Sequence, residues 1–404
     1  MNDLREQFPF FKKSDQVWLD SASTTQKPSI LFDTEQKVYQ EENANIHRGL
    51  YASSELITEK YEDARAVVAQ WINALKEELI FTSGTTAAIN CIATYWAPLF
   101  VKKGDEIIIT IAEHHSNFLP WQRYAEQVGA VLTVIPYDQE NRRLDFSSVS
   151  ITEKTKLVAV SHYSNVLGPI WNKKSNELVT FLKKAQSVGA FTFLDAAQSM
   201  PHQKLDVQEL PVDAAAFSAH KVCGPTAVGG LFLRKKWHEK LPPFFVGGGM
   251  VNRASLSEST WLPAPVKFEA GTPAIVQAIS WGAALNLLNG YITKQDKKSF
   301  QSLVRYTVEG LTEISELQIL GNLKWIQKTG SLLSFHIPGI HAHDIAAFLA
   351  HEWIAVRAGH HCAQPLLESL SITSSVRISL FYYNTKEDVD KFLKVLQKAI
   401  KFLK

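Results

Sequence analysis

Between about residues 77 and 235, short apolar runs alternate with longer amphipathic stretches. This alternation predicts a parallel sheet covered by helices. The predicted strands are residues 79–82, 106–111, 131–135, 157–160, 191–194, 214–218 and 228–233. Helical patterns lie between most of them, for example at residues 86–97, 119–128 and 176–187. The predicted fold class is therefore α/β, with a mainly parallel seven-stranded sheet between helices.

The pattern changes in the last third of the chain. Residues 241–273 are rich in glycine, proline and aromatic side chains, which predicts loops. A long helical stretch over residues 275–314, a strand over 332–337 and a helix from Lys386 predict a smaller α+β C-terminal domain. The predicted division is an N-terminal arm (1–20) packing with the small domain, a large domain (21–275) and the small domain (276–404).

Composition narrows the possible partners. The 404 residues are 46% hydrophobic and 20% charged, and 42 basic against 40 acidic side chains leave a net charge of +2. No excess charge is available for a nucleic acid or an anionic membrane surface, so we expect neither as a partner. The amino terminus lacks an apolar signal core, and the three widely spaced cysteines favour a reducing compartment. We therefore expect a cytoplasmic protein.

Polar side chains follow several of the predicted strands. These segments are residues 82–85, 113–115, 161–165, 195–198 and 218–221. In open α/β sheets, ligands bind beyond the carboxyl ends of the strands. The five segments should therefore converge on one crevice.

The sequence SGTT suggests a phosphate site. Gly84 permits a tight turn after a strand, and Thr85 and Thr86 stand at the start of a helix. Helix N-terminal N–H groups and nearby hydroxyls favour an anion. A threonine-capped helix without a ligand would explain the same pattern.

Asp195 and Lys221 each end an apolar strand. A buried carboxylate needs a cation, and a protonated pyridine nitrogen would serve, although a helix N-cap is the simpler alternative for Asp195. A lysine at a strand end before a glycine-proline turn can be desolvated and nucleophilic, although most such lysines are solvated. The functional interpretation of each residue is stronger because both occur in the same sequence.

Motifs along nearly the whole chain carry a family resemblance. They are WLDSASTTQKP (18–28), NIHRG (45–49), SGTT (83–86), EHHSNFLPW (113–121), SNVLG (164–168), LDAAQ (194–198), FSAHKVCGPT (217–226), FEAGTP (268–273), RAGHHCAQPLL (357–367) and YNTKEDVD (383–390). In this order they resemble the fold-type-I pyridoxal-phosphate enzymes, specifically the cysteine desulfurases of the class V aminotransferase family. The C-terminal stretch looks most like group II, the SUF-type desulfurases and the cysteine sulfinate desulfinases, and CAQPLL leans towards the latter.

The resemblance implies a cofactor site for pyridoxal 5′-phosphate. Lys221 would carry the cofactor as a Schiff base, His114 would stack on its ring, Asp195 would pair with the ring nitrogen, and Gln198 would hydrogen-bond the ring hydroxyl. The phosphate would be held by Thr85, Thr86, Ser218, His220 and, from the neighbouring subunit of a homodimer, Thr272.

The resemblance also implies a substrate site. Arg377 would bind the substrate carboxylate bidentately with Asn165 beside it, and Arg357 would line the entrance. Cys362 would attack the substrate sulfur, leaving alanine and a protein persulfide. Metal ligation by His360, His361 and Cys362 is the alternative reading of this loop. It would need three adjacent side chains to turn to one ion, so we expect no metal.

The expected function is an L-cysteine desulfurase that passes sulfur from Cys362 to an acceptor, for which a SufE-like protein of iron–sulfur cluster assembly is the expected partner. One alternative is a cysteine sulfinate desulfinase or selenocysteine lyase in which Cys362 is dispensable. Another is a non-catalytic scaffold, which the intact Lys221, Asp195, His114 and Arg377 argue against.

Overall fold

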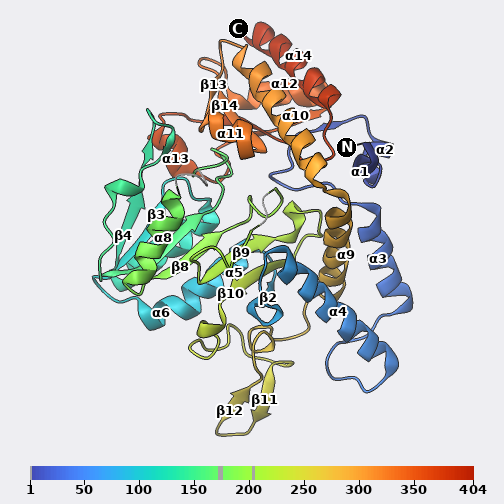
Figure 1. The fold of residues 1–404 in the computed structure, drawn as a ribbon, viewed down its shortest axis with the longest axis vertical. Coiled ribbons are helices and arrows are strands. Elements are labelled where there is room, and N and C mark those ends of the chain that lie inside the picture. The colour runs from blue at the N-terminus through green and yellow to red at the C-terminus, as the bar shows by residue number, and fades with distance from the viewer. Residues whose placement is uncertain (1, 172–175, 203–204) are drawn as a thin grey trace.

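The computed structural model describes residues 2–171, 176–202 and 205–404, and a seven-stranded sheet lies at its centre (Figure 1). In spatial order the strands are β2 (Leu79–Thr82), β10 (Gly229–Leu233), β9 (Ala214–Ser218), β8 (Phe191–Asp195), β7 (Thr155–Ser161), β3 (Glu106–Thr110) and β4 (Val131–Ile135). Pairing is parallel from β9 to β4, whereas β10 runs antiparallel to both neighbours. The predicted, mainly parallel α/β sheet is confirmed, with strand ends within two residues of the prediction.

The central strands read as apolar runs because both of their faces are covered. Every residue of β8, β9 and β10 is buried. One face packs against residues 85–100 and α7 (Leu119–Val128). The other face packs against α8 (Glu177–Ser187), α4 (Ala52–Trp71) and α9 (Ile275–Tyr291), and α3 (Ser29–Glu41) lies on α9. The sheet is thus the middle layer of a helix–sheet–helix sandwich.

The helix predicted over residues 86–97 differs in detail. It consists of α5 (Thr85–Cys91), a π-helical turn over residues 92–96 and α6 (Ala97–Phe100). Pro98 has no N–H to continue the α-helical ladder, and a wider turn accommodates this loss. Among the described residues, no helix has both the length and the apolar character needed to cross a membrane.

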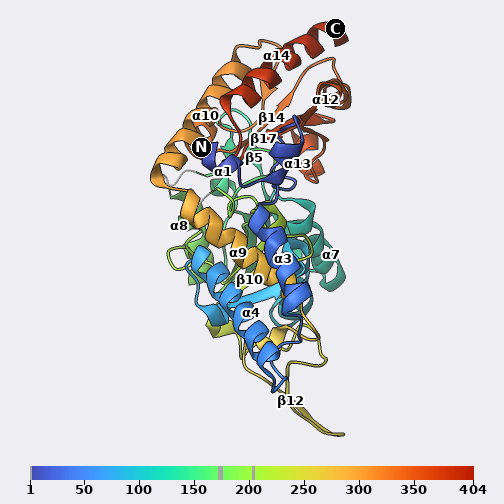
Figure 2. The ribbon, with the colours of Figure 1, turned by 90° about the vertical axis from the view of Figure 1, so that its right-hand side faces the viewer.

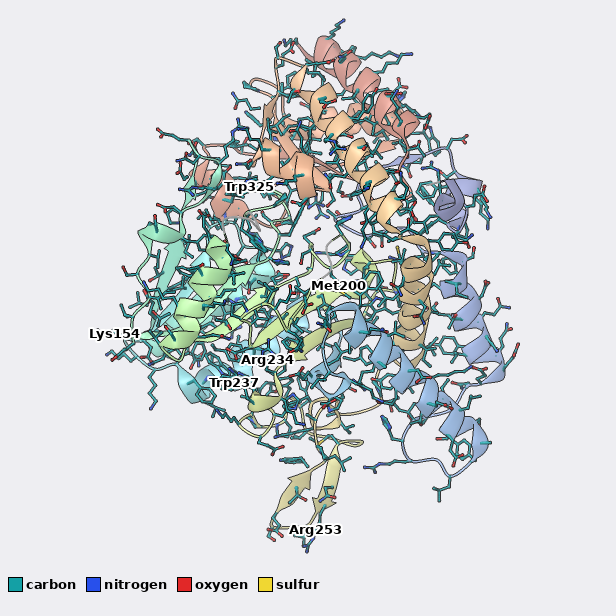
Figure 3. The ribbon with its side chains drawn as sticks, in the orientation of Figure 1. Lys154, Met200, Arg234, Trp237, Arg253 and Trp325 are labelled. Carbon is teal, nitrogen blue, oxygen red and sulfur yellow. The ribbon has the colours of Figure 1, made fainter. Side chains whose placement is uncertain are left out.

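The prediction of loops over residues 241–273 is wrong for part of that segment. β11 (Val251–Ala254) and β12 (Ser259–Trp261) form an antiparallel hairpin that projects from the molecule (Figures 1 and 2). Arg253 lies near its far end (Figure 3). Most hairpin residues are exposed, so the strands lack the alternation of apolar and polar residues that marks a half-buried strand.

The C-terminal part contains a second, four-stranded antiparallel sheet. Its spatial order is β13 (Gln318–Ile319), β14 (Leu332–His336), β17 (Ser375–Ser379) and β16 (Arg357–Gly359). The helices of this part are α10 (Lys294–Thr312), α11 (Leu323–Thr329), α12 (Ala342–His351), α13 (Gln364–Ser369) and α14 (Lys386–Leu403). The stretch predicted as helical from 275 to 314 divides between α9 and α10, because Thr293 caps α10 in a capping box with Asp296.

The N-terminal segment crosses to this second sheet. It contains α1 (Asn2–Arg5), α2 (Pro9–Lys13) and β1 (Val17–Trp18), and β1 pairs in parallel with β15 (Ile354–Ala355). A parallel bridge then joins Asp20 to Ser379, and the chain continues to α3, which packs on α9. Elsewhere in the chain, β5 (Tyr137–Asp138) and β6 (Arg143–Leu144) pair as a short antiparallel hairpin. The crossing places Asp20 beside the arginines of β16 and β17.

Candidate active site

A cavity with about 790 Å³ of empty space, partly open to solvent, lies between the carboxyl ends of the central strands and the four-stranded sheet. The segments after β2, β3, β7, β8 and β9 all contribute to its wall, so the expected convergence is observed. The predicted residues that line it are Thr85, Thr86, His114, Asn165, Asp195, Gln198, Ser218, His220, Lys221, Arg357, Cys362 and Arg377. Residues at the ends of the central strands and residues from the four-stranded sheet and the loop after β16 therefore line the same cavity.

Hydroxyl groups gather where α5 begins. The Thr85 backbone N–H donates to Ser218 Oγ at 2.9 Å, and the hydroxyls of Thr85 and Ser218 are 2.8 Å apart. Thr86 Oγ1 lies 2.8 Å from Ser116 Oγ. Gly84 makes the preceding turn with a φ of 137°, a conformation that favours glycine. This end of the cavity suits a phosphate, because a helix N-terminus and hydroxyl donors face it together.

Hydrogen bonds to a single carbonyl fix the loop that carries Lys221. The His220 carbonyl accepts from Thr24 Oγ1 (3.0 Å), Thr25 Oγ1 (3.1 Å) and Lys27 Nζ (3.0 Å). Burial lowers the pKa of His220 to about 4, so its imidazole is neutral at pH 7 and can donate one N–H. The segment after β1 thereby holds the turn that follows β9.

Lys221 and Asp195 bring opposite charges into the cavity. Burial lowers the pKa of Lys221 to about 8, and the charge of Asp195 opposes this shift. Burial raises the pKa of Asp195, whose Oδ1 accepts from the Ala197 N–H at 2.9 Å. Lys221 keeps some exposed area because it faces the cavity. A lysine with this pKa has an appreciable fraction of neutral, nucleophilic amine at neutral pH.

His114 presents a neutral ring to the cavity. Its Nδ1 accepts from the Ser116 N–H at 3.1 Å, which places the proton on Nε2. Burial, reinforced by the charge of Lys221, lowers the pKa of His114 to about 3. The ring is therefore uncharged at neutral pH.

Glu113, which the sequence did not single out as a functional residue, precedes His114 in the chain and joins the ends of β3 and β7. Its carboxylate accepts from Thr110 Oγ1, Asn117 Nδ2 and Ser161 Oγ, each at 2.6 Å. Burial raises its pKa to about 7 despite these donors. The network fixes the backbone that carries His114.

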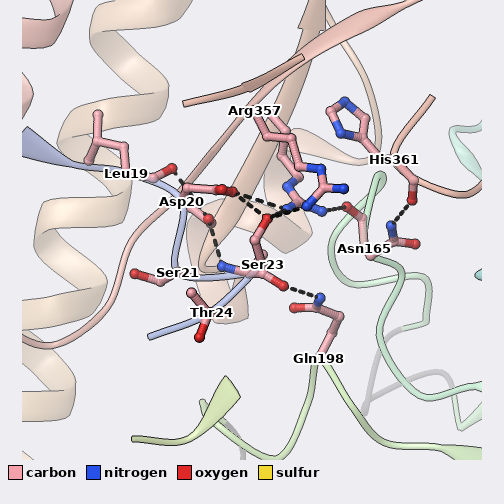
Figure 4. Close-up of polar contacts among 12 residues, drawn as sticks. Leu19, Asp20, Ser21, Ser23, Thr24, Asn165, Gln198, Arg357 and His361 are labelled. Carbon is pink, nitrogen blue, oxygen red and sulfur yellow. Dashed lines mark hydrogen bonds and ion pairs between the residues drawn. The ribbon is translucent and has the colours of Figure 1, made fainter. Parts of the chain in front are cut away.

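Arg377 of β17 and Arg357 of β16 line the cavity, and Figure 4 shows Arg357 beside Ser23. Arg377 Nη2 lies 3.2 Å from Asp20 Oδ1, and Arg377 and Arg357 both donate to Ser23 Oγ, at 2.9 and 2.8 Å. Arg377 Nη1 donates to the Asn165 carbonyl at 3.0 Å. Burial lowers the pKa of Arg377 to about 10, and Asp20 opposes the shift. Among the described residues Arg377 Nε is a buried donor without a hydrogen-bond partner.

The loop between β16 and α13 carries Cys362, which is half-buried in the cavity wall. His361 (φ 53°) and Cys362 (φ 55°) are both left-handed, at about 1–2 kcal/mol for each non-glycine residue. Asn165 Nδ2 donates to the His361 carbonyl at 2.5 Å (Figure 4), and the His115 N–H donates to the Cys362 carbonyl at 2.7 Å. His361 Nε2 lies 3.0 Å from the Ser375 carbonyl. Hydrogen bonds thus hold a strained turn.

The comparisons with known proteins agree on one family. A model of the aminotransferase class-V family matches residues 17–392. The chain belongs to this family.

Two similar proteins and two solved structures show how far the likeness extends. A probable cysteine desulfurase from Halalkalibacterium halodurans is 41% identical, covering 98% of this chain and 97% of the relative. One from Synechocystis is 40% identical, covering 99% and 95%. The apo structure of a cysteine desulfurase from Thermococcus onnurineus NA1 matches with a TM-score of 0.91 at 37% identity, and the cysteine desulfurase CsdA from Escherichia coli with 0.90 at 35%. Each structural match covers 99% of this chain and 98% of the other. The fold is that of the cysteine desulfurases in this family.

The residues present in the cavity fit pyridoxal 5′-phosphate, the cofactor that class-V membership implies. The hydroxyls at the start of α5 match a phosphate, and the buried carboxylate of Asp195 matches a protonated ring nitrogen. The amine of Lys221 has a lowered pKa and can bind an aldehyde. Gln198 Nε2 donates to the Ala22 carbonyl at 2.8 Å (Figure 4), which fixes the side chain at the cavity wall.

Thr272 is the predicted residue that does not line this cavity. It is exposed and lines a second cavity with His47 and Arg48. Its predicted phosphate contact is therefore not made within the described part of this one chain.

Three residues that hold the site were missed by the sequence reasoning, although the family motifs contain them. Asp20 and Ser23 stand in WLDSASTTQKP, and Glu113 begins EHHSNFLPW. Their positions in conspicuous motifs were the available signal. Their partners depend on the tertiary fold and could not be read from the sequence.

Proposed function

We propose that this chain is a pyridoxal-phosphate-dependent L-cysteine desulfurase that converts L-cysteine to L-alanine and leaves the sulfur as a persulfide on Cys362. The observation that supports this most is that Lys221, Arg377 and Cys362 line one cavity. A reactive amine, a carboxylate-binding cation and a thiol are the groups this reaction requires. The relatives described above, at 35–41% identity, are named cysteine desulfurases.

Substrate binding would depend on Arg377. Its guanidinium would bind the carboxylate of cysteine, and Asp20 and Ser23 would keep it aimed at the cavity. Arg357 would add positive charge to this part of the cavity. Ser23 Oγ accepts from both arginines and would hold them beside each other. This arrangement would select an amino acid by its carboxylate and would leave the substrate side chain directed towards Cys362.

Lys221 would hold the cofactor and carry protons. When bound, pyridoxal 5′-phosphate supplies an electron sink that stabilises negative charge on the substrate α-carbon. Asp195 would keep the ring nitrogen protonated, and the neutral ring of His114 would cover the ring face. The amine of Lys221 would take the α-proton and return a proton to form alanine.

Cys362 would perform the sulfur transfer as a thiolate nucleophile. A bond would form between Cys362 Sγ and the substrate sulfur while the substrate carbon–sulfur bond breaks. The electron pair of the broken bond would stay with the carbon, which is protonated to give the methyl group of alanine. Cys362 would then carry one additional sulfur atom and no oxidant would be needed.

A cysteine sulfinate desulfinase or selenocysteine lyase is the second candidate. Sulfinate and selenium leave carbon more readily than sulfur does, so such an enzyme would not require Cys362. The position of Cys362 in the cavity wall favours the first candidate.

Comparing wild type and Cys362→Ala on L-cysteine and on cysteine sulfinate tests the proposal. The variant should keep the yellow absorbance of the bound cofactor, lose alanine formation from cysteine by a factor of about 10³, and keep its activity on cysteine sulfinate. Ser369→Ala, in α13 of the same region, is the control and should match wild type. Equal turnover of cysteine by wild type and Cys362→Ala would sink the desulfurase proposal.

We also propose a homodimer in which Thr272 reaches the partner's phosphate site. Its position outside the cavity of its own chain supports this, as do the exposed side chains of Leu50 and Leu256, which an interface would cover. Mixing inactive Lys221→Ala with inactive Thr272→Ala chains should restore activity in mixed dimers, because one site then receives both residues. The proposal would be contradicted if light scattering showed a monomer and that monomer were fully active.

The sulfur acceptor proposed for Cys362 is a SufE-like protein, supported by the group-II resemblance and by the partly exposed thiol. The three free cysteines support a cytoplasmic location. Without reductant, alanine formation should stop after about one turnover and resume when the acceptor is added. A linear time course without either addition would argue against persulfide transfer.

A further inference from the structure

We propose that Asn165 is a positioning residue for Cys362. The side-chain amide of Asn165 holds residues 360–363, the Cys362 loop, in the conformation that keeps the thiol in the cavity wall. This inference deepens the proposed function and rests on it, because it assigns a residue to the presentation of the sulfur-accepting thiol. The bond that carries it joins Asn165 Nδ2 to the His361 carbonyl at 2.5 Å.

The bond acts where the backbone is least favourable. His361 and Cys362 are consecutive left-handed residues, and neither is glycine. Such a turn persists only when surrounding contacts overcome its intrinsic preference. The carbonyls of both strained residues are bound, one by the Asn165 amide and the other by the backbone N–H of His115. Loss of either bond should let the loop relax towards an ordinary backbone.

Asn165 is well suited to fix this loop because it is itself fixed. It is 4% exposed, and Ser164 Oγ accepts from the N–H groups of the two residues that follow it in the turn after β7. Its own carbonyl accepts from Arg377 Nη1 at 3.0 Å. One residue thus contacts both the carboxylate-binding arginine and the loop that carries the thiol. The distance from the bound carboxylate to Cys362 Sγ is set through Asn165.

The strength of the contact suits a loop that must also release its thiol. A neutral buried hydrogen bond changes an equilibrium by about fivefold, which is enough to favour the closed loop but not to lock it. Cys362 must approach the substrate sulfur and then be reached by an acceptor. A single hydrogen bond from the Asn165 amide to this strained turn allows both.

The test measures the reactivity of Cys362 towards iodoacetamide in the substrate-free holoenzyme. Cys91 and Cys223 are 6% and 0% exposed, so peptide mapping should find the label on Cys362. In Asn165→Ala the alkylation rate should rise about fivefold, because the His361 carbonyl loses its donor. Hydrogen exchange of the peptide covering residues 357–366 should become faster in the same variant.

Two further variants separate positioning from other roles. Arg357→Lys changes another side chain of the cavity wall, one that donates to Ser23 Oγ, and leaves the Asn165 amide in place, so it should alkylate at nearly the wild-type rate. Asn165→Ser keeps a polar side chain that is too short to reach the His361 carbonyl. It should therefore show the same faster alkylation as Asn165→Ala, and it replaces that variant in the test if Asn165→Ala does not fold. Retained cofactor absorbance and melting temperature identify folded variants.

The outcomes distinguish this inference from the proposed function. Unchanged alkylation in both Asn165 variants would overturn the positioning role even if the wild type desulfurates cysteine. Equal acceleration in Arg357→Lys would also overturn it, because the effect would then follow any change in the cavity wall. Failure of the wild type to use cysteine would overturn the proposed function, whereas alkylation would still report how the loop is held.

Discussion

The floor and the rim of the cavity are built in different ways. The floor, formed by Thr85, Asp195, Ser218 and Lys221, stands at the ends of strands whose positions are set by sheet hydrogen bonds and buried neighbours. The rim, formed by Arg357, Arg377 and the Cys362 loop, belongs to the small sheet. Individual hydrogen bonds join it to the rest of the cavity, from Arg377 to Ser23 and from Asn165 to the His361 carbonyl.

The difference follows from what each part would have to do. A cofactor site benefits from groups that do not reorganise, because donors held in place need not be ordered when the ligand binds. A thiol that receives sulfur and passes it on must move between two partners. The floor therefore uses strand ends, whereas the rim uses a strained turn held by individual hydrogen bonds.

The largest effect should come from the floor. Lys221→Ala should lower cysteine turnover by a factor of about 10³ or more, since it removes the group that is proposed to carry both cofactor and protons. The yellow absorbance should disappear with the activity. Lys235→Ala, a change at a lysine whose side chain is 71% exposed, is the matched control and should leave both unchanged. Full activity in Lys221→Ala would show that the floor is wrongly assigned.

A rim variant should keep the cofactor and lose substrate affinity. Arg377→Lys should raise KM for cysteine by a factor of about 10 to 100, because lysine cannot bind a carboxylate bidentately while contacting Asp20 and Ser23. The absorbance should persist. Asp20→Asn should raise KM less, since it weakens only the support of the guanidinium. A loss of cofactor in Arg377→Lys would erase the distinction between floor and rim.

The smallest effect is a shift along the pH axis in the rate at which cofactor-free protein takes up the cofactor. Only the neutral amine of Lys221 reacts with an aldehyde, and burial lowers its pKa to about 8. Incorporation should rise about tenfold per pH unit below pH 8 and level off above it. Because the charge of Asp195 raises this pKa, Asp195→Asn should move the levelling to lower pH. A rise that continues to pH 10 would contradict the burial of the amine.

Most of the sheet and floor could be predicted because local sequence encodes them. Apolar runs marked the seven strands, and polar residues directly after them marked the cavity. The exposed hairpin of β11 and β12 carries no such pattern, and the break between α9 and α10 rests on one cap at Thr293. These features depend on weak local preferences that the surrounding pattern obscures.

The supports of the rim could not be predicted because they join distant parts of the chain. Asp20 contacts Arg377 across 357 positions, a contact that follows from the pairing of β1 with β15. The left-handed backbone of His361 and Cys362 has no sequence signature, since neither residue is glycine. Family motifs identified Cys362 itself, but only the structure shows what holds it.

The measurement that tests the central claim most directly is the mass of the Cys362 peptide after a single turnover of L-cysteine without reductant. We expect one alanine per active site and a peptide heavier by one sulfur atom, with the addition reversed by a thiol reductant. Alanine formation with an unmodified Cys362 peptide and free sulfide in solution would contradict the assignment of Cys362 as the sulfur acceptor.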